Sequence, residues 1–175
     1  MLRKLLLTTG LAAVVAASAA TQGGGLGTPY CFGVNCPCGN DDSSAGCANS
    51  SGRGAALVAT GSTSVASNAI AYTATHLATS AVSLLVVSTN QRNIPFGDGR
   101  LCVGPGMVRN RTHLNSGQGG TVTFTNVIGT LAAYGCVIEA GQTWHAQVWF
   151  RDTAHQGVCG SRVNLTNAYS VTFTQ

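Results

Sequence analysis

Four cysteines fall between residues 31 and 47, in a stretch rich in glycine, asparagine and serine. They are Cys31, Cys36, Cys38 and Cys47, and they constrain the fold more than any other feature of the chain. The stretch has too few apolar side chains to order itself by burial, so the cysteines must act either as cross-links or as metal ligands. Short zinc-binding segments carry two CxxC pairs or alternate Cys with His, and a redox centre carries one CxxC. None of these patterns occurs here, so disulfides are the better interpretation.

The N-terminus supports that interpretation, because it predicts export. Arg3 and Lys4 precede an almost wholly apolar run over 5–17, and Ser18-Ala19-Ala20 offers a signal-peptidase site. This is the pattern of a secretory signal, and its apolar run is too short to span a bilayer. Removing residues 1–20 of the 175 leaves 155 residues, the size of one domain. We therefore predict a secreted or cell-surface protein with no membrane insertion after cleavage, in a compartment where disulfides persist.

The pairing of the clustered cysteines stays open between two arrangements. Cys36 and Cys38 are separated by one residue, and such neighbours rarely bond because the geometry is strained. Either Cys31 pairs with Cys36 and Cys38 with Cys47, or Cys31 pairs with Cys38 and Cys36 with Cys47. Both arrangements staple the segment.

Three further cysteines lie later in the chain. Cys102 and Cys159 each stand beside turn-forming glycines, and we predict that they bond to each other. Cys136 begins a short apolar run, which is typical of an inert buried thiol. The odd number of cysteines leaves an intermolecular bond as the alternative.

From Gly54 onward, short β-favouring runs alternate with turn residues. Alternation with a period of two indicates strands with one buried face, and many such strands predict an all-β fold, an antiparallel sandwich or barrel. We favour the β-sandwich, with AVSLLVVST at 81–89 as a central strand because it is apolar on both faces. The predicted organisation is a signal peptide over 1–20, a Gly/Cys-rich disulfide-stapled segment over 21–53 and the β-sandwich over 54–175. The runs are AALVATG, NAIAYTATHL, AVSLLVVST, RLCV, GMVRNRTHL, TVTFTNV, CVIEAG, QTWHAQVWFRD and NAYSVTFTQ.

The run QTWHAQVWFRD supplies the candidate binding site. Its alternation assigns Trp144, Ala146, Val148 and Phe150 to the core face. The opposite face then carries an indole among polar side chains, an arrangement suited to stacking on a sugar ring. The alternative is that Arg151 lies over the indole, or pairs with Asp98 or Asp152, and so covers it. The candidate ligand-binding residues are His145, Gln147, Trp149 and Arg151.

Charge limits the partners. Only 8% of the residues are charged, against about 25% in an average soluble domain. Signal cleavage removes Arg3 and Lys4, which lowers the net charge from +4 to +2. The basic stretch RNRT at 109–112 is short, so we expect no nucleic acid partner.

The residue types in the sequence give only weak support for catalysis or metal binding. The chain has no GxSxG, HExxH, P-loop or dinucleotide motif. A hydrolase would have to combine Asp98 and Asp152 with a histidine, and His145 and His155 flank QVWFRD closely enough in sequence to meet one ligand. We therefore expect no enzyme and no cofactor. Calcium is the one ion with a candidate set, formed by loop oxygens without the spacing of a known calcium loop. That set is Asn40, Asp41, Asp42 and Asp98.

Several motifs together resemble a known module. They are GTPYCFG, CPCGN and GCANSSG within 27–52, IPFGDGRLCVG at 94–104, QVWFRD at 147–152 and NLTNAYSVTFT at 164–174. This combination is similar to an uncharacterised secreted β-rich module, found often at the C-terminal end of long exported bacterial proteins. The resemblance covers nearly the whole mature chain and implies export, disulfides and a β-rich fold, but no activity. It also implies that Cys136 is an addition of this chain, outside the family's set of six cysteines.

These observations favour a non-catalytic secreted or cell-surface binding module that contacts carbohydrate or extracellular matrix. A surface protein is an alternative partner, and a homo-oligomer fits the low charge. The second hypothesis is a structural subunit that assembles through sheet edges into a filament or coat. The third is a secreted hydrolase.

Overall fold

The computed structural model describes residues 26–153 and 159–175. The chain is nearly all β, as the sequence predicts, and every pairing between its named strands is antiparallel. The described residues also form one short helix, α1. The elements are β1 Thr28–Tyr30, β2 Ala56–Thr60, β3 Ala71–Thr75, β4 Val82–Ser88, β5 Gln91–Phe96, β6 Gly99–Val103, β7 Val108–Arg109, β8 Leu114–Asn115, β9 Val122–Phe124, α1 Val127–Ala132, β10 Thr143–Arg151, β11 Val163–Leu165 and β12 Ala168–Thr172.

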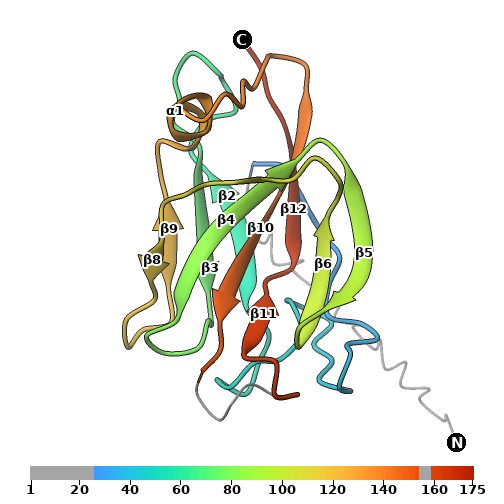
Figure 1. The fold of residues 1–175 in the computed structure, drawn as a ribbon. Coiled ribbons are helices and arrows are strands. Elements are labelled where there is room, and N and C mark those ends of the chain that lie inside the picture. The colour runs from blue at the N-terminus through green and yellow to red at the C-terminus, as the bar shows by residue number, and fades with distance from the viewer. Residues whose placement is uncertain (1–25, 154–158) are drawn as a thin grey trace, which may run out of the picture.

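The strands form a two-layer sandwich with a separate hairpin. The large sheet has the order β1-β12-β10-β4-β7, with β11 paired to β10 and β8 paired to β4. The small sheet, β2-β3-β9, lies behind β4 and β10 in Figure 1. The hairpin β5–β6 lies at the right of Figure 1. The large sheet therefore has one face against the small sheet and one outer face, part of which the hairpin covers.

The core lies between the two sheets. Trp144, Ala146, Val148 and Phe150 of β10 are all buried in it, which confirms the face assigned from their alternation. The small sheet contributes Tyr72 of β3 and neighbouring apolar side chains. Burying each large apolar side chain contributes about 1.5–3 kcal/mol, so this shared interior holds the two layers together.

Strand β4 is central, as its apolar run predicts, because it lies between β10 on one side and β7 and β8 on the other. Several other segments differ from the sequence interpretation, and among them strands β1 and β11 lie outside the predicted runs. Strand β5 was not predicted, because all its residues are exposed and Pro95 interrupts the pattern. The run CVIEAG at 136–141 forms no strand, since it follows helix α1 as a chain of turns and irregular backbone.

The disulfides correct the predicted pairing. The bonds are Cys31–Cys102, Cys36–Cys47 and Cys38–Cys159. Cys36–Cys47 belongs to one of the two arrangements considered and is confirmed. The other proposed pairs are wrong, namely Cys31–Cys38, Cys31–Cys36, Cys38–Cys47 and Cys102–Cys159. Cys136 is free and buried, as predicted.

The physical reason for the correction is the position of the N-terminal segment. Strand β1 pairs with β12 along Thr28–Tyr30, so the start of the segment is fixed to the large sheet as well as to itself. The next residue, Cys31, is thereby placed against β6, and Cys38 against the turn before β11. Two of the three bonds therefore tie the segment to distant parts of the chain, with sequence separations of 71 and 121.

Within residues 26–153 and 159–175, no helix is long and apolar enough to cross a membrane.

Candidate functional site

A pocket of about 190 Å³ opens on the outer face of the large sheet, and Trp149 lines it. Trp149 of β10 stands opposite Leu84 of β4 and Leu165 of β11 in the strand registers, so three neighbouring strands supply its floor. The hairpin forms one wall through Phe96 and Leu101. The lining residues are Leu84, Val86, Phe96, Leu101, Met107, Arg109, Trp149 and Leu165.

A second, wider hollow of about 750 Å³ adjoins the first. The two share Leu84, Met107 and Arg109, so they adjoin, and we call the pair together the outer groove. Its wider part is polar and basic at the rim. That part is lined by Leu84, Met107, Val108, Arg109, Asn110, Arg111, His113 and Tyr134.

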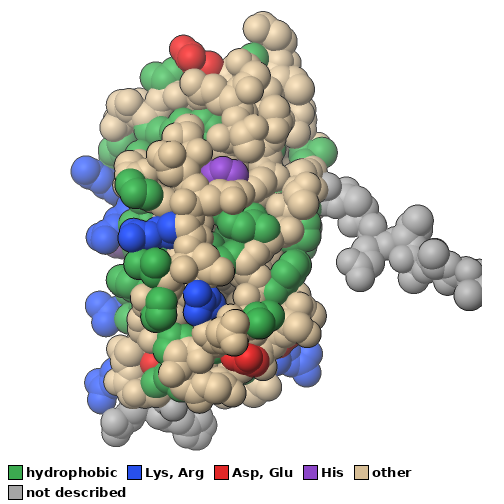
Figure 2. Space-filling model, turned by 90° about the vertical axis from the view of Figure 1, so that its right-hand side faces the viewer, with side chains coloured by type: hydrophobic (Ala, Val, Ile, Leu, Met, Phe, Trp, Pro, Cys, Tyr) green, Lys and Arg blue, Asp and Glu red, His purple; other side chains and the backbone are tan. Residues whose placement is uncertain are grey.

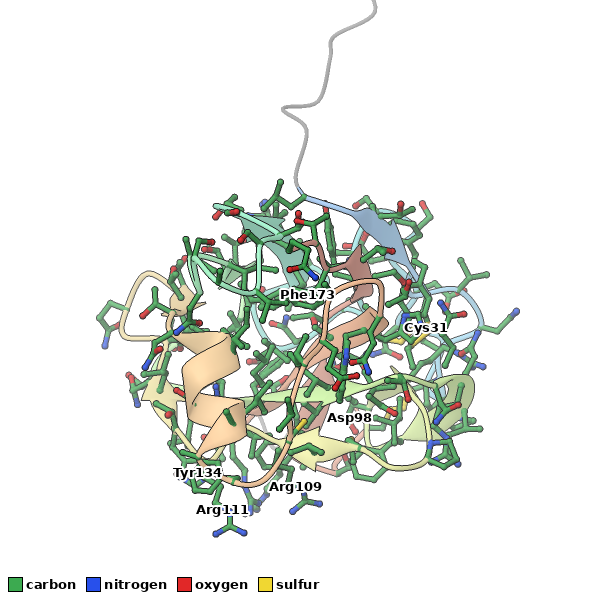
Figure 3. The ribbon with its side chains drawn as sticks, turned by 90° about the horizontal axis from the view of Figure 1, so that it is seen from above. Cys31, Asp98, Arg109, Arg111, Tyr134 and Phe173 are labelled. Carbon is green, nitrogen blue, oxygen red and sulfur yellow. A yellow bond between two sulfur atoms is a disulfide. The ribbon has the colours of Figure 1, made fainter. Side chains whose placement is uncertain are left out.

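Arginines surround the outer groove. Arg109, Arg111 and Arg151 are all exposed. The Arg111 guanidinium lies 4.8 Å from the ring centre of Tyr134, and that of Arg151 lies 5.3 Å from the ring centre of Trp149. Figure 3 shows Arg109, Arg111 and Tyr134 together on one side of the molecule, pointing away from the sheet.

Much of the positive charge in Figure 2 lies on one side of the molecule. In Figure 2, Lys and Arg side chains gather along the left edge, which is the face turned toward the viewer in Figure 1. Among the residues described, none that lines the outer groove carries a carboxylate. The groove therefore combines an apolar floor with unpaired positive charge, although the whole chain is nearly neutral.

The four candidate residues from β10 separate into two pairs. Trp149 is partly exposed and Arg151 is exposed, with its guanidinium over the indole, as the alternative interpretation expected. His145 and Gln147 are only 8% and 0% exposed, because the hairpin covers them.

Gln147 is fully engaged in structural hydrogen bonds. Its Oε1 accepts from the Cys102 N–H at 3.0 Å. Its Nε2 donates to the carbonyls of Arg100 at 2.9 Å and Thr166 at 2.7 Å. No polar atom of the amide remains for a ligand, so Gln147 holds the hairpin to the sheet.

His145 is likewise enclosed by protein. Its Nδ1 lies 2.8 Å from Ser170 Oγ and 3.3 Å from Gln91 Nε2, and its ring contacts Tyr30 edge to face. Burial lowers the pKa of His145 below its ordinary value, because an enclosed site disfavours the charged ring. The ring is therefore neutral at pH 7 and adds no charge to the groove.

The residues considered for hydrolysis do not surround a cleft. Asp98 and Asp152 are both fully buried. Asp152 accepts from Ser50 N–H at 2.8 Å and from the Ser50 hydroxyl, and Asp98 accepts from Ser161 N–H at 3.2 Å. His145 contacts neither of them, and His155 lies outside the described residues. Asp98 and Asp152 therefore cross-link loops, and neither lies at an open surface.

Two of the four calcium candidates, Asp41 and Asp42, already accept hydrogen bonds from the protein itself. Asp41 accepts from the backbone N–H groups of Asn35 and Cys36, at 3.1 and 2.7 Å. Asp42 accepts from Ser44 and from Gly54 N–H, and these hydrogen bonds lower its pKa, that from the Ser44 side chain most. Both carboxylates organise the cysteine-rich loop.

Sequence reasoning missed most of the groove. Phe96 belongs to a strand that was not predicted, and Tyr134 follows the short helix α1. Leu84 carried a usable signal, because an apolar residue on the outer face of a central strand needs a cover or a ligand. No family model, curated protein or solved structure matches the chain.

Proposed function

We propose that this protein is a non-catalytic binding module of the cell exterior whose outer groove binds an acidic polysaccharide. One observation carries the proposal: the indole of Trp149 lines an apolar pocket beside exposed arginines, with no carboxylate among the described lining residues. A flat aromatic face packs against the C–H face of a sugar ring. Guanidinium groups bind carboxylate or sulfate through paired hydrogen bonds.

Export is part of the proposal. Six of the seven cysteines are joined in disulfides, which persist in oxidising compartments. Residues 1–20 have the pattern of a secretory signal, and the motifs resemble a module of exported bacterial proteins. These features support a secreted or surface-attached protein that meets matrix polymers.

The binding experiment uses the oxidised mature chain and polygalacturonate as the acidic probe, with neutral dextran for comparison. We expect binding to polygalacturonate only, because the groove offers positive charge. Trp149→Ala should lower the affinity about tenfold, equivalent to about 1.4 kcal/mol. Arg109→Gln should also lower it, with a weaker dependence on salt.

Arg53→Gln is the matched control, because Arg53 is exposed but lies in a different hollow, beside Asp42. Its affinity should equal that of the parent. Unchanged binding by Trp149→Ala would refute the proposed surface, as would equal binding of dextran and polygalacturonate.

A second candidate function, self-assembly, is favoured by strand β5. Among the described residues it pairs only with β6, all its residues are exposed, and Ile94 and Phe96 are 38% and 44% exposed. A free strand edge with apolar side chains is a template for pairing with another chain. Size-exclusion chromatography with light scattering tests this second function. A protein that stays monomeric at about 100 µM, where weak pairing of strand edges would be detected, would contradict assembly.

A further inference from the structure

Two fully enclosed oxygen atoms lack a hydrogen-bond partner. They are Asn40 Oδ1 and Asp98 Oδ2, on residues that are 9% and 0% exposed. Nearly all buried polar groups in folded proteins are satisfied, and an unsatisfied one costs about 1–3 kcal/mol, more when it is charged. Both atoms are acceptors on adjoining residues, so they lack the same kind of partner.

The two residues are joined at one point between the cysteine-rich loop and the hairpin turn. Asn40 Nδ2 donates to the Asp98 carbonyl at 2.9 Å and to the Ala48 carbonyl at 2.7 Å. Asn164 Nδ2 also reaches Ala48, at 3.1 Å. Because the Asn40 amide nitrogen has two carbonyl partners, the amide orientation is fixed and its oxygen is the atom left over.

We propose that Asn40 Oδ1 and Asp98 Oδ2 bind a hard divalent cation, with calcium as the best match. A cation is the partner that two acceptors share, and one of them belongs to a buried carboxylate with no arginine or lysine bonded to that oxygen among the described residues. Calcium takes carboxylate, amide and carbonyl oxygens in flexible geometry, completed by water.

The neighbouring sulfurs argue against a soft metal. A carboxylate oxygen of Asp98 lies within 4.8 Å of the sulfurs of Cys38 and Cys159. These two sulfurs are joined to each other, and a disulfide does not supply the thiolate that zinc or copper prefers. Only the oxygen ligands remain. The ion would join the cysteine-rich loop to the β5–β6 turn and so support one wall of the outer groove.

The direct test is calcium uptake by the oxidised wild-type chain after treatment with chelator. We expect one calcium ion per chain in equilibrium dialysis with radioactive calcium. We also expect the melting temperature in 5 mM calcium (about 100-fold above an assumed Kd near 50 µM) to exceed that in EDTA by about 5 °C. Failure of the wild-type chain to take up calcium would overturn the proposal.

Asp98→Asn tests the assignment, because it removes the charge and keeps the shape. This variant should lose the calcium-dependent shift. Asp152→Asn is the matched control: Asp152 is equally buried, but its oxygens are bonded to Ser50, so the variant should lose stability and keep the shift. Retention of the shift in Asp98→Asn would place the ion elsewhere and contradict the assignment. Should Asp98→Asn not fold, the uptake by wild type still decides. Polygalacturonate binding is measured separately in EDTA. A failure to bind calcium can then be told apart from a failure of the proposed polysaccharide binding.

Discussion

Gln147 makes three of the hydrogen bonds that hold the hairpin in place. It bonds to the backbone of β6 on one side and to the carbonyl of Thr166 on the other, entirely out of solvent. Each of these buried backbone groups would lose its partner if the amide were removed.

Gln147→Leu should therefore destabilise the protein by about 2–4 kcal/mol, since several buried polar groups become unsatisfied at once. Urea denaturation followed by tryptophan fluorescence measures the loss. Arg151, an exposed residue of the same strand, provides a control. Arg151→Gln should change the stability by less than about 0.5 kcal/mol. A similar small effect of Gln147→Leu would show that the hairpin is held by other contacts.

His145 makes the stability depend on pH. Its pKa is lowered in the folded chain by burial, so below about pH 6.5 the unfolded chain binds a proton that the folded chain resists. Above that pH the ring is neutral in both the folded and the unfolded chain, and the protein has its full stability. The stability then decreases as the pH falls toward the pKa of His145 in the folded chain. We expect the free energy of unfolding to decrease as the pH falls below about 6.5.

His145→Gln should flatten this part of the stability curve, whereas His113→Gln, at an exposed position, should leave it unchanged. Calorimetry at several pH values measures both. Identical curves for the parent and His145→Gln would contradict this assignment.

At the scale of elements, the hairpin β5–β6 and strand β1 decide the shape of the site. Tyr30 at the end of β1 donates its hydroxyl hydrogen to the Cys102 carbonyl at 3.0 Å, and Cys31 bonds to Cys102 itself. The N-terminal segment therefore secures the hairpin that forms one wall of the outer groove.

The double variant Cys31→Ser with Cys102→Ser should loosen the hairpin and leave the sandwich folded. A disulfide typically contributes about 2–4 kcal/mol, and here the loss should fall on one element. Hydrogen exchange should increase over residues 91–103 and stay slow in β4 and β10. Equal protection of the hairpin in parent and variant would mean that Gln147 holds the hairpin in place without the disulfide.

The sequence predicted the strands whose alternation reports burial directly. The core face of β10 and the central position of β4 followed from period-two patterns, which depend only on local geometry. The hairpin did not follow, because β5 is exposed and its contacts with the large sheet are distant in sequence. The disulfide between Cys31 and Cys102 depends on the same long-range packing, which no local spacing encodes. Trp149 and Arg151 were found from β10 alone, but the burial of His145 and Gln147 required the hairpin.

For the whole molecule, distribution matters more than net charge. The described residues include seven arginines and five carboxylates, and two of the carboxylates, Asp98 and Asp152, are buried. The arginines at the outer groove are exposed, with no carboxylate among its described lining residues. A nearly neutral chain thus presents a positive surface to an acidic polymer.

The two tryptophans of the chain, Trp144 and Trp149, permit a direct test of this claim within one molecule. The Trp144 indole is buried and donates to Gln142 Oε1 at 2.9 Å, whereas that of Trp149 lines the groove. In a nuclear magnetic resonance titration with oligogalacturonate, we predict that the indole N–H signal of Trp149 shifts and that of Trp144 stays in place. Saturating oligosaccharide that leaves the Trp149 signal unmoved would contradict binding at the outer groove.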